Sequence, residues 1–127
     1  MEVIVSSHAP EAIGPYSQGI ATSTKKTLFI SGQIPVDRQT GQFAGTTIAE
    51  QTEQCLKNLR AILASSQADL SHVVKTTVFL TDIQDFAEMN EVYSSFFQAP
   101  YPARSTIAVA ALPKGAKIEI EAIAELS

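Results

Sequence analysis

Hydrophobic and polar residues follow a strand-like pattern in six parts of the chain. Three parts are rich in β-branched and aromatic residues or alternate regularly: residues 27–34, 73–80 and 117–124. Three shorter runs predict further strands: residues 3–5, 20–23 and 104–110. In the last strand the alternation turns Ile118, Ile120 and Ala122 inward and leaves Glu119 and Glu121 outward. A polar turn of hairpin length, Thr24-Lys25-Lys26, precedes the strand at 27–34.

Two stretches carry the spacing of amphipathic helices instead. Thr47 and Glu50 form a capping box, which predicts a helix from this point to about Ser66. A second helix begins with Asp82 or Asp85 as its cap and ends before Pro100. Its predicted apolar face consists of Ile83, Phe86, Met89, Val92, Tyr93, Phe96 and Phe97.

The order of these elements predicts a single α/β domain over residues 1–127. Two amphipathic helices cover one face of a sheet and leave the other face without cover from the same chain. A bare sheet face exposes a large apolar patch unless subunits pack there, so we expect a homo-oligomer. The alternative that the pattern leaves open is a monomer with a polar outer face.

Composition and charge exclude several classes of function. A net charge of -4 argues against binding to phosphate backbones, which requires a basic face. One cysteine, Cys55, allows no internal disulfide, and neither a signal peptide nor an apolar run of membrane-spanning length is present, so we expect a cytoplasmic protein. His8 and His72 lie far apart without other ligands at suitable spacing, so we expect no metal. The six glycines are scattered and form no phosphate-binding loop, and we expect no cofactor.

The candidate chemistry centres on Arg104, which follows Pro100 and Pro102 at the start of a strand. A guanidinium held there is a two-pronged donor for a planar carboxylate, although a surface ion pair is the ordinary alternative. Other polar residues at strand ends and in loops complete the candidate set: Tyr16, Ser31, Gly32, Thr106 and Glu119. A glutamate in such a set holds a water or moves a proton, but Glu119 is equally well a solvated carboxylate.

The geometry of a simple hairpin separates the two charged candidates. If the last two strands paired about Pro113-Lys114, Arg104 would lie opposite a residue near Ile123 and four positions from Glu119. Four strand positions span ~13 Å, which is too far for one small substrate. We therefore expect a site between subunits.

Five motifs, in this order, cover essentially the whole chain. They are Ala12-Ile-Gly-Pro-Tyr-Ser-Gln-Gly, Ile30-Ser-Gly-Gln-Ile-Pro-Val, Val74-Lys-Thr-Thr-Val-Phe-Leu-Thr-Asp, Tyr101-Pro-Ala-Arg-Ser and Lys117-Ile-Glu-Ile-Glu-Ala-Ile-Ala. Together they resemble the RidA (YjgF/YER057c/UK114) family of reactive-intermediate deaminases. The resemblance implies a chorismate-mutase-like α/β (α+β) fold, with a mixed six-stranded sheet and two helices on one face. It also implies a homotrimer with sites between subunits, and a last strand inserted between the two half-units instead of paired with its predecessor.

The resemblance also implies an activity and roles for residues. Family members hydrolyse enamine and imine intermediates such as 2-aminoacrylate, which pyridoxal-phosphate dehydratases release, to a 2-keto acid and ammonia. Arg104 matches the clamp for the substrate carboxylate and Glu119 the residue that places the attacking water. Tyr16, Ser31, Gly32 and Thr106 match residues that line the pocket. Many members carry a cysteine where this chain has Thr106, so thiol-based redox behaviour of relatives is not expected here.

Three alternative functions stay open on the sequence. A non-catalytic regulatory trimer that binds 2-keto acids needs Arg104 but not Glu119. A ribonuclease or translation inhibitor fits labels attached to relatives, but the acidic balance and the lack of a histidine acid/base pair count against it. The sequence does not address the third, a holdase-type chaperone.

Overall fold

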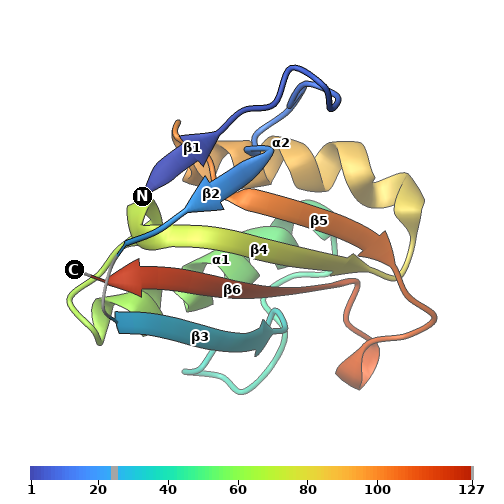
Figure 1. Ribbon diagram of the computed structural model, residues 1–127. Coiled ribbons are helices and arrows are strands. Elements are labelled where there is room, and N and C mark those ends of the chain that lie inside the picture. The colour runs from blue at the N-terminus through green and yellow to red at the C-terminus, as the bar shows by residue number, and fades with distance from the viewer. Residues whose placement is uncertain (24–25, 127) are drawn as a thin grey trace.

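Strands and helices alternate along the chain in the predicted order (Figure 1). The computed structural model describes residues 1–23 and 26–126. Within them lie β1 Glu2–Ile4, β2 Gly19–Ala21, β3 Lys26–Gln33, α1 Ile48–Ala64, β4 Val73–Leu80, α2 Phe86–Phe96, β5 Ala103–Ala108 and β6 Ile118–Leu126. Short 3-10 turns occur at η1 Leu70–His72, η2 Ile83–Asp85 and η3 Pro113–Gly115. Thr24 and Lys25 of the predicted turn lie outside the described residues, and Lys26 already belongs to β3.

The strands form a mixed sheet whose order differs from their order in the chain. Four of them are hydrogen-bonded in the order β3-β6-β4-β5, with β4 and β5 parallel and the other pairs antiparallel. The short strands β1 and β2 form a separate antiparallel pair, which one bridge between Ser17 and Ala103 connects to the edge of β5. The predicted α/β class is therefore confirmed, with the six strands hydrogen-bonded as four plus two.

The expectation of a simple hairpin between the last two strands is wrong. β6 lies between β3 and β4, so Ile123 pairs with Phe29 and Lys75, whereas Arg104 on β5 pairs with Thr76. Every second residue of β6 is buried along the whole strand. A central place in the sheet suits such a strand, because the backbone groups on both of its edges then form hydrogen bonds with neighbouring strands. The insertion of the last strand that the family resemblance implied is confirmed.

Helix α1 begins where the capping box predicts. Thr47 accepts a hydrogen bond from the backbone of Glu50 at 3.1 Å, and Glu50 accepts one from the backbone of Thr47 at 3.2 Å. The helix ends at Ala64, two residues before the predicted end. The buried side of α1, with Leu56, Leu59 and Leu63, packs against alternate residues of the sheet. The sheet residues of this core include Val78, Ile118 and Ile120.

The start of α2 differs from the prediction. Asp82 caps the 3-10 turn η2, where Gln84 donates a backbone hydrogen bond to its carboxylate at 2.9 Å. Asp85 occupies the cap position of α2 without a side-chain hydrogen bond. Because η2 precedes the helix, Ile83 is not part of its buried face and is 49% exposed. Of the predicted apolar face, Met89, Tyr93 and Phe97 are buried in the core.

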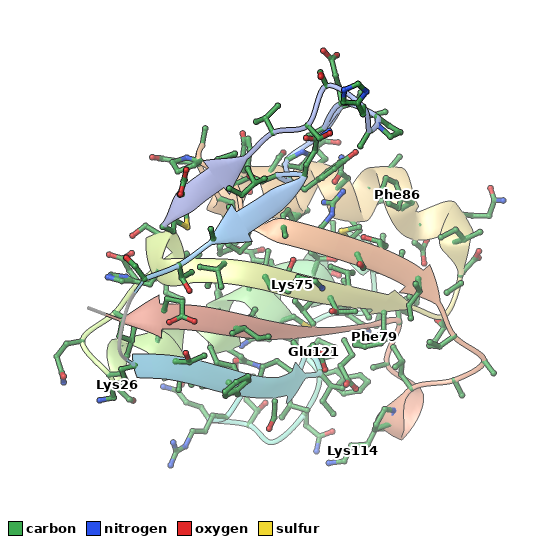
Figure 2. All side chains as sticks on the ribbon, in the orientation of Figure 1. Lys26, Lys75, Phe79, Phe86, Lys114 and Glu121 are labelled. Carbon is green, nitrogen blue, oxygen red and sulfur yellow. The ribbon has the colours of Figure 1, made fainter. Side chains whose placement is uncertain are left out.

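Both helices lie on one face of the four-stranded sheet, as predicted, and the other face carries no helix (Figure 1). Figure 2 shows Lys75, Phe79 and Glu121 on this open face. Phe29 and Ile107, on the outer strands β3 and β5, are 73% and 46% exposed. No helix in the described part of the chain is long and apolar enough to cross a membrane.

Candidate functional site

Arg104 lies half-buried between β5 and α2, with its guanidinium among aromatic rings. Its Cζ atom is 4.9 Å from the ring centre of Tyr93 and 5.6 Å from those of Tyr16 and Phe86. Its Nη1 donates a hydrogen bond to the side-chain oxygen of Asn90 at 2.6 Å. Among residues 1–23 and 26–126, Arg104 has no carboxylate partner. The surface ion pair considered as its ordinary role is therefore not formed here.

Burial of this unpaired cation has an electrostatic cost. Loss of solvent lowers the pKa of Arg104 from its ordinary value, although the electron-rich Tyr93 and Tyr16 act in the opposite direction. A buried charge is stabilised when an opposite charge reaches it. The site is thus set up to gain from binding an anion.

Hydrogen bonds at the edge of the sheet hold the rings in place. Ser17 donates its backbone N–H to Pro102 O at 3.0 Å and its hydroxyl to Tyr101 O, which fixes Tyr16 beside the start of β5. The hydroxyl of Tyr93 is hydrogen-bonded at 2.8 Å to Thr76, the residue that pairs with Arg104 in the sheet. These contacts leave the guanidinium little freedom to turn.

Thr106 is two residues beyond Arg104 on the same face of β5. Its hydroxyl is buried and has no hydrogen-bond partner within the described residues. A buried hydroxyl without a partner costs stability. The Thr106 hydroxyl, two residues from Arg104, would therefore gain from a hydrogen bond to a ligand at this site.

Glu119, Ser31 and Gly32 form a second group, where β3 and β6 pair around a bulge. The register shifts between Ile30 and Gln33, so Ser31 and Gly32 of β3 together lie opposite the single residue Glu121 of β6. A side chain at Gly32 would overlap the Glu119 carboxylate, because an added Cβ would lie only 2.7 Å from its Cδ atom. Glycine at position 32 therefore makes the space in which Glu119 lies.

The two groups lie on opposite faces of the sheet. Arg104 contacts α2, on the helix-covered face, whereas Glu119 pairs with Phe79 among the residues that point to the open face. Strand β4 also separates their strands. A single chain therefore brings Tyr16, Arg104 and Thr106 together, and separately Ser31, Gly32 and Glu119, but does not unite the two.

Sequence reasoning missed Asn90 and assigned Phe86 and Tyr93 only to the core. The three residues are spaced four and three positions apart, so they share one side of α2. A polar residue at helical spacing inside an aromatic stripe was the signal available in the sequence.

Other reactive groups lie apart from these residues. Cys55 is buried, and loss of solvent raises the pKa of its thiol, which disfavours the reactive thiolate. His72 is engaged in the turn with Asp69. In residues 1–23 and 26–126, no three histidine, cysteine, aspartate or glutamate side chains gather as possible metal ligands.

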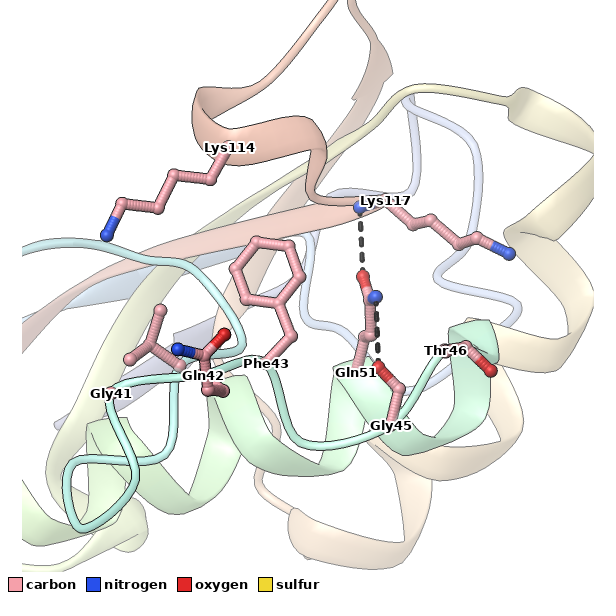
Figure 3. A pocket seen from close by; sticks show the side chains of 9 residues that line it. Gly41, Gln42, Phe43, Gly45, Thr46, Gln51, Lys114 and Lys117 are labelled. Atoms are coloured by element: carbon pink, nitrogen blue, oxygen red, sulfur yellow. Dashed lines mark hydrogen bonds between the residues drawn. The ribbon is translucent and has the colours of Figure 1, made fainter.

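A shallow pocket of about 600 Å³ lies between the loop before α1 and the turn before β6 (Figure 3). At its floor Gln51 accepts a hydrogen bond from the backbone of Lys117 and donates one to Gly45 O. Lys114 and Lys117 extend from its rim, on either side of Phe43. None of the predicted site residues lines this pocket.

Fold and geometry together define a small mixed α/β protein whose candidate site centres on a half-buried arginine without a carboxylate partner among the described residues. The family model described as Endoribonuclease L-PSP matches residues 6–126. The chain therefore belongs to this family, and its resemblance to the RidA group is confirmed.

Three relatives illustrate the relationship. The RutC family protein y4sK of Sinorhizobium fredii is 54% identical over 127 residues, which cover 100% of this chain and 99% of the relative. The human 2-iminobutanoate/2-iminopropanoate deaminase is 49% identical over 122 residues, covering 96% of this chain and 88% of that protein. The crystal structure of E. coli TdcF with bound serine superposes with a TM-score of 0.77 at 45% identity and covers 100% of both chains.

Proposed function

We propose that this protein hydrolyses the C=N bond of small 2-imino acids, such as 2-iminobutanoate and the 2-iminopropanoate formed from 2-aminoacrylate. The observation that carries the proposal is Arg104, a half-buried guanidinium that Asn90 and aromatic rings orient and that has no carboxylate partner in the part of the chain that the structure describes. Such a group is a binding partner for the carboxylate that every 2-imino acid carries. The name of the human relative, a deaminase of 2-imino acids, supports this substrate class.

The reaction requires little from the protein. Water adds to the electrophilic imine carbon to give a carbinolamine, which loses ammonia and leaves the 2-keto acid. In the proposed mechanism Arg104 holds the carboxylate, and the carboxylate of Glu119 places the water and takes up its proton. The same proton is returned to the departing nitrogen, so no redox partner, metal or cofactor is needed. Tyr16, Ser31, Gly32 and Thr106 line the pocket in this proposal.

We place the site between subunits of a homotrimer, which we propose to be a cytoplasmic assembly of single-domain chains. The support is the position of Arg104 and Glu119 on opposite faces of one sheet, because a neighbouring copy is required to bring the two groups together. The open face, with Phe29 and Ile107 exposed, is apolar enough to be covered by another subunit. The proposed source of substrate is a pyridoxal-phosphate dehydratase.

A coupled assay tests the activity. Threonine dehydratase acting on threonine generates the imine, and early 2-keto acid release is followed with and without this protein. We expect acceleration by the wild type and its loss in both Arg104→Ala and Glu119→Ala, with all proteins checked for folding and oligomeric state. No acceleration by a folded wild-type oligomer would refute the deaminase proposal.

A regulatory protein that binds 2-keto acids is the second candidate, because Arg104 serves either function. The two differ at Glu119, which binding alone does not need. Binding of 2-ketobutyrate by the wild type and by Glu119→Ala, with no turnover by either, would favour the regulator.

Ribonuclease activity is named in the description of the family model. The net charge of -4 and the engagement of His72 in a local turn weigh against RNA cleavage at this site.

A further inference from the structure

Helix α2 contributes a hydrogen-bond acceptor as well as aromatic contacts to the guanidinium of Arg104. Asn90 accepts the bond from Nη1 at 2.6 Å, and the rings of Phe86 and Tyr93 contact the same group from the same side of the helix. One N–H of the five that a guanidinium carries is therefore committed to the helix. The others stay available for a ligand.

The acceptor is neutral, and this is unusual for a half-buried arginine. Buried guanidinium groups are ordinarily paired with carboxylates, which cancel their charge. The groups that face Arg104 here are the amide of Asn90 and the rings of Phe86, Tyr93 and Tyr16. Burial raises the pKa of the Tyr93 hydroxyl to about 12, so this neighbour is neutral at physiological pH.

The carboxylates of α2 point elsewhere. Glu88 and Glu91 are exposed and line a separate pocket with Ala49. The helix therefore presents its one short amide, and neither glutamate, to the arginine.

We propose that Asn90 is a positioning residue that orients Arg104 without neutralising it, and so reserves the charge of the guanidinium for a monocarboxylate ligand. The oxygen of Asn90 fixes one edge of the guanidinium, so that the remaining donors face the ligand as a fork. A carboxylate at the same position would hold the arginine equally well but would compete with the ligand. This inference rests on the proposed function, because the ligand is the same 2-imino or 2-keto acid.

The isosteric substitution Asn90→Asp separates orientation from charge. It retains an oxygen for the bond to Nη1 and strengthens that bond, so we expect stability to thermal unfolding equal to or above that of the wild type. The added charge repels the ligand, and we expect affinity for 2-ketobutyrate to fall by about ten-fold or more. In turnover, KM should rise more than kcat falls, because the carboxylate contact is made in both ground state and transition state.

Asn90→Ala and Gln98→Glu complete the set. Asn90→Ala loses the oriented fork and some stability but adds no charge, so its affinity should lie between those of the wild type and Asn90→Asp. Gln98→Glu adds the same charge at an exposed position beyond the end of α2 and should bind as the wild type does. A purely structural role for Asn90 would instead make the losses of affinity follow the losses of stability.

Butyrate, which carries the carboxylate but cannot be hydrolysed, separates this inference from the proposed function. Calorimetry with butyrate and 2-ketobutyrate measures the clamp without turnover. If the wild type binds butyrate, Asn90→Asp does not, and no imine is hydrolysed, the role of Asn90 stands while the deaminase proposal fails. If Asn90→Asp binds both acids as the wild type does, or if the wild type binds neither, the role proposed for Asn90 is refuted.

Discussion

Single residues decide where the carboxylate of Glu119 lies. Gly32 belongs to a sequence motif, but only the structure reveals that the volume of its absent side chain is filled by Glu119. The bulge formed by Ser31 and Gly32 places this gap directly beside β6. One hydrogen atom in place of a methyl group therefore sets the position of a proposed catalytic group.

Replacing Gly32 by alanine should impair activity more than stability. The new Cβ displaces the flexible end of Glu119, and a displacement near 1 Å is expected to lower kcat/KM by about one to two orders of magnitude. The free energy of unfolding, measured by urea denaturation, should change by less than ~1 kcal/mol, because alanine is not intrinsically disfavoured relative to glycine in a strand. Gly19→Ala is the matched control, since its Cβ would meet Ile4 at an ordinary 3.6 Å. Full activity of Gly32→Ala would show that the position of Glu119 is unimportant.

At the scale of elements, local chemistry decides where α1 begins. The reciprocal bonds between Thr47 and Glu50 involve residues three apart, so the sequence predicts them without knowledge of the fold. α2 lacks such a device: Asp82 caps η2, and Asp85 makes no side-chain bond to the helix. Its start was correspondingly harder to predict.

Thr47→Ala should lower the free energy of unfolding by about 1 kcal/mol, because the helix loses the side chain that caps it. Urea denaturation measures the change. Thr46→Ala is the control, since Thr46 is the exposed neighbour and offers Glu50 only its backbone N–H. An equal loss of unfolding free energy in Thr47→Ala and Thr46→Ala would contradict the capping role of Thr47.

Glu50 gives this helix start a pH dependence. Hydrogen bonds from the Thr47 backbone, the Thr47 hydroxyl and the Thr46 backbone lower the pKa of Glu50 below its ordinary 4.5. A carboxylate with a lower pKa in the folded state stabilises the fold above its unfolded pKa, and loses that contribution as the pH falls through the folded value. Glu50→Gln should therefore be less stable than the wild type at pH 7, with the difference shrinking in acid below pH 4.5. A difference that is constant from pH 7 to pH 3 would exclude this contribution.

At the scale of the whole molecule, one chain holds two incomplete halves of the proposed site. Tyr16, Arg104 and Thr106 lie toward the helix-covered face, and Glu119 with Gly32 lies on the open face. In the proposed trimer, a cyclic arrangement of copies would supply the missing half of each site from a neighbour.

Mixing two inactive variants should restore activity. In trimers reassembled from equal amounts of Arg104→Ala and Glu119→Ala chains, a site that takes Arg104 from one subunit and Glu119 from the next is intact about one time in four. We therefore expect about a quarter of wild-type turnover after joint refolding, and none after each variant is refolded alone. Persistent inactivity of mixed trimers, verified by mass spectrometry, would mean that both groups act within one chain.

The sequence by itself determined the features that depend on near neighbours. Strand β4, the start of α1 and the inward side of β6 follow from alternation, capping and helical spacing, which are interactions over a few residues. The motifs around Gly32 and Arg104 were also sufficient to indicate the family.

Only the tertiary structure decided how distant segments meet. The place of β6 between β3 and β4 results from pairing and burial across the whole sheet, so the family resemblance implied it but the alternation and turn pattern predicted a hairpin instead. The contact of Asn90 with Arg104 likewise depends on the tertiary structure, because it joins a helix and a strand that a loop separates. The positions of Arg104 and Glu119 relative to each other also depend on the tertiary structure, because strand order and the alternation of faces together place them on opposite sides of one sheet.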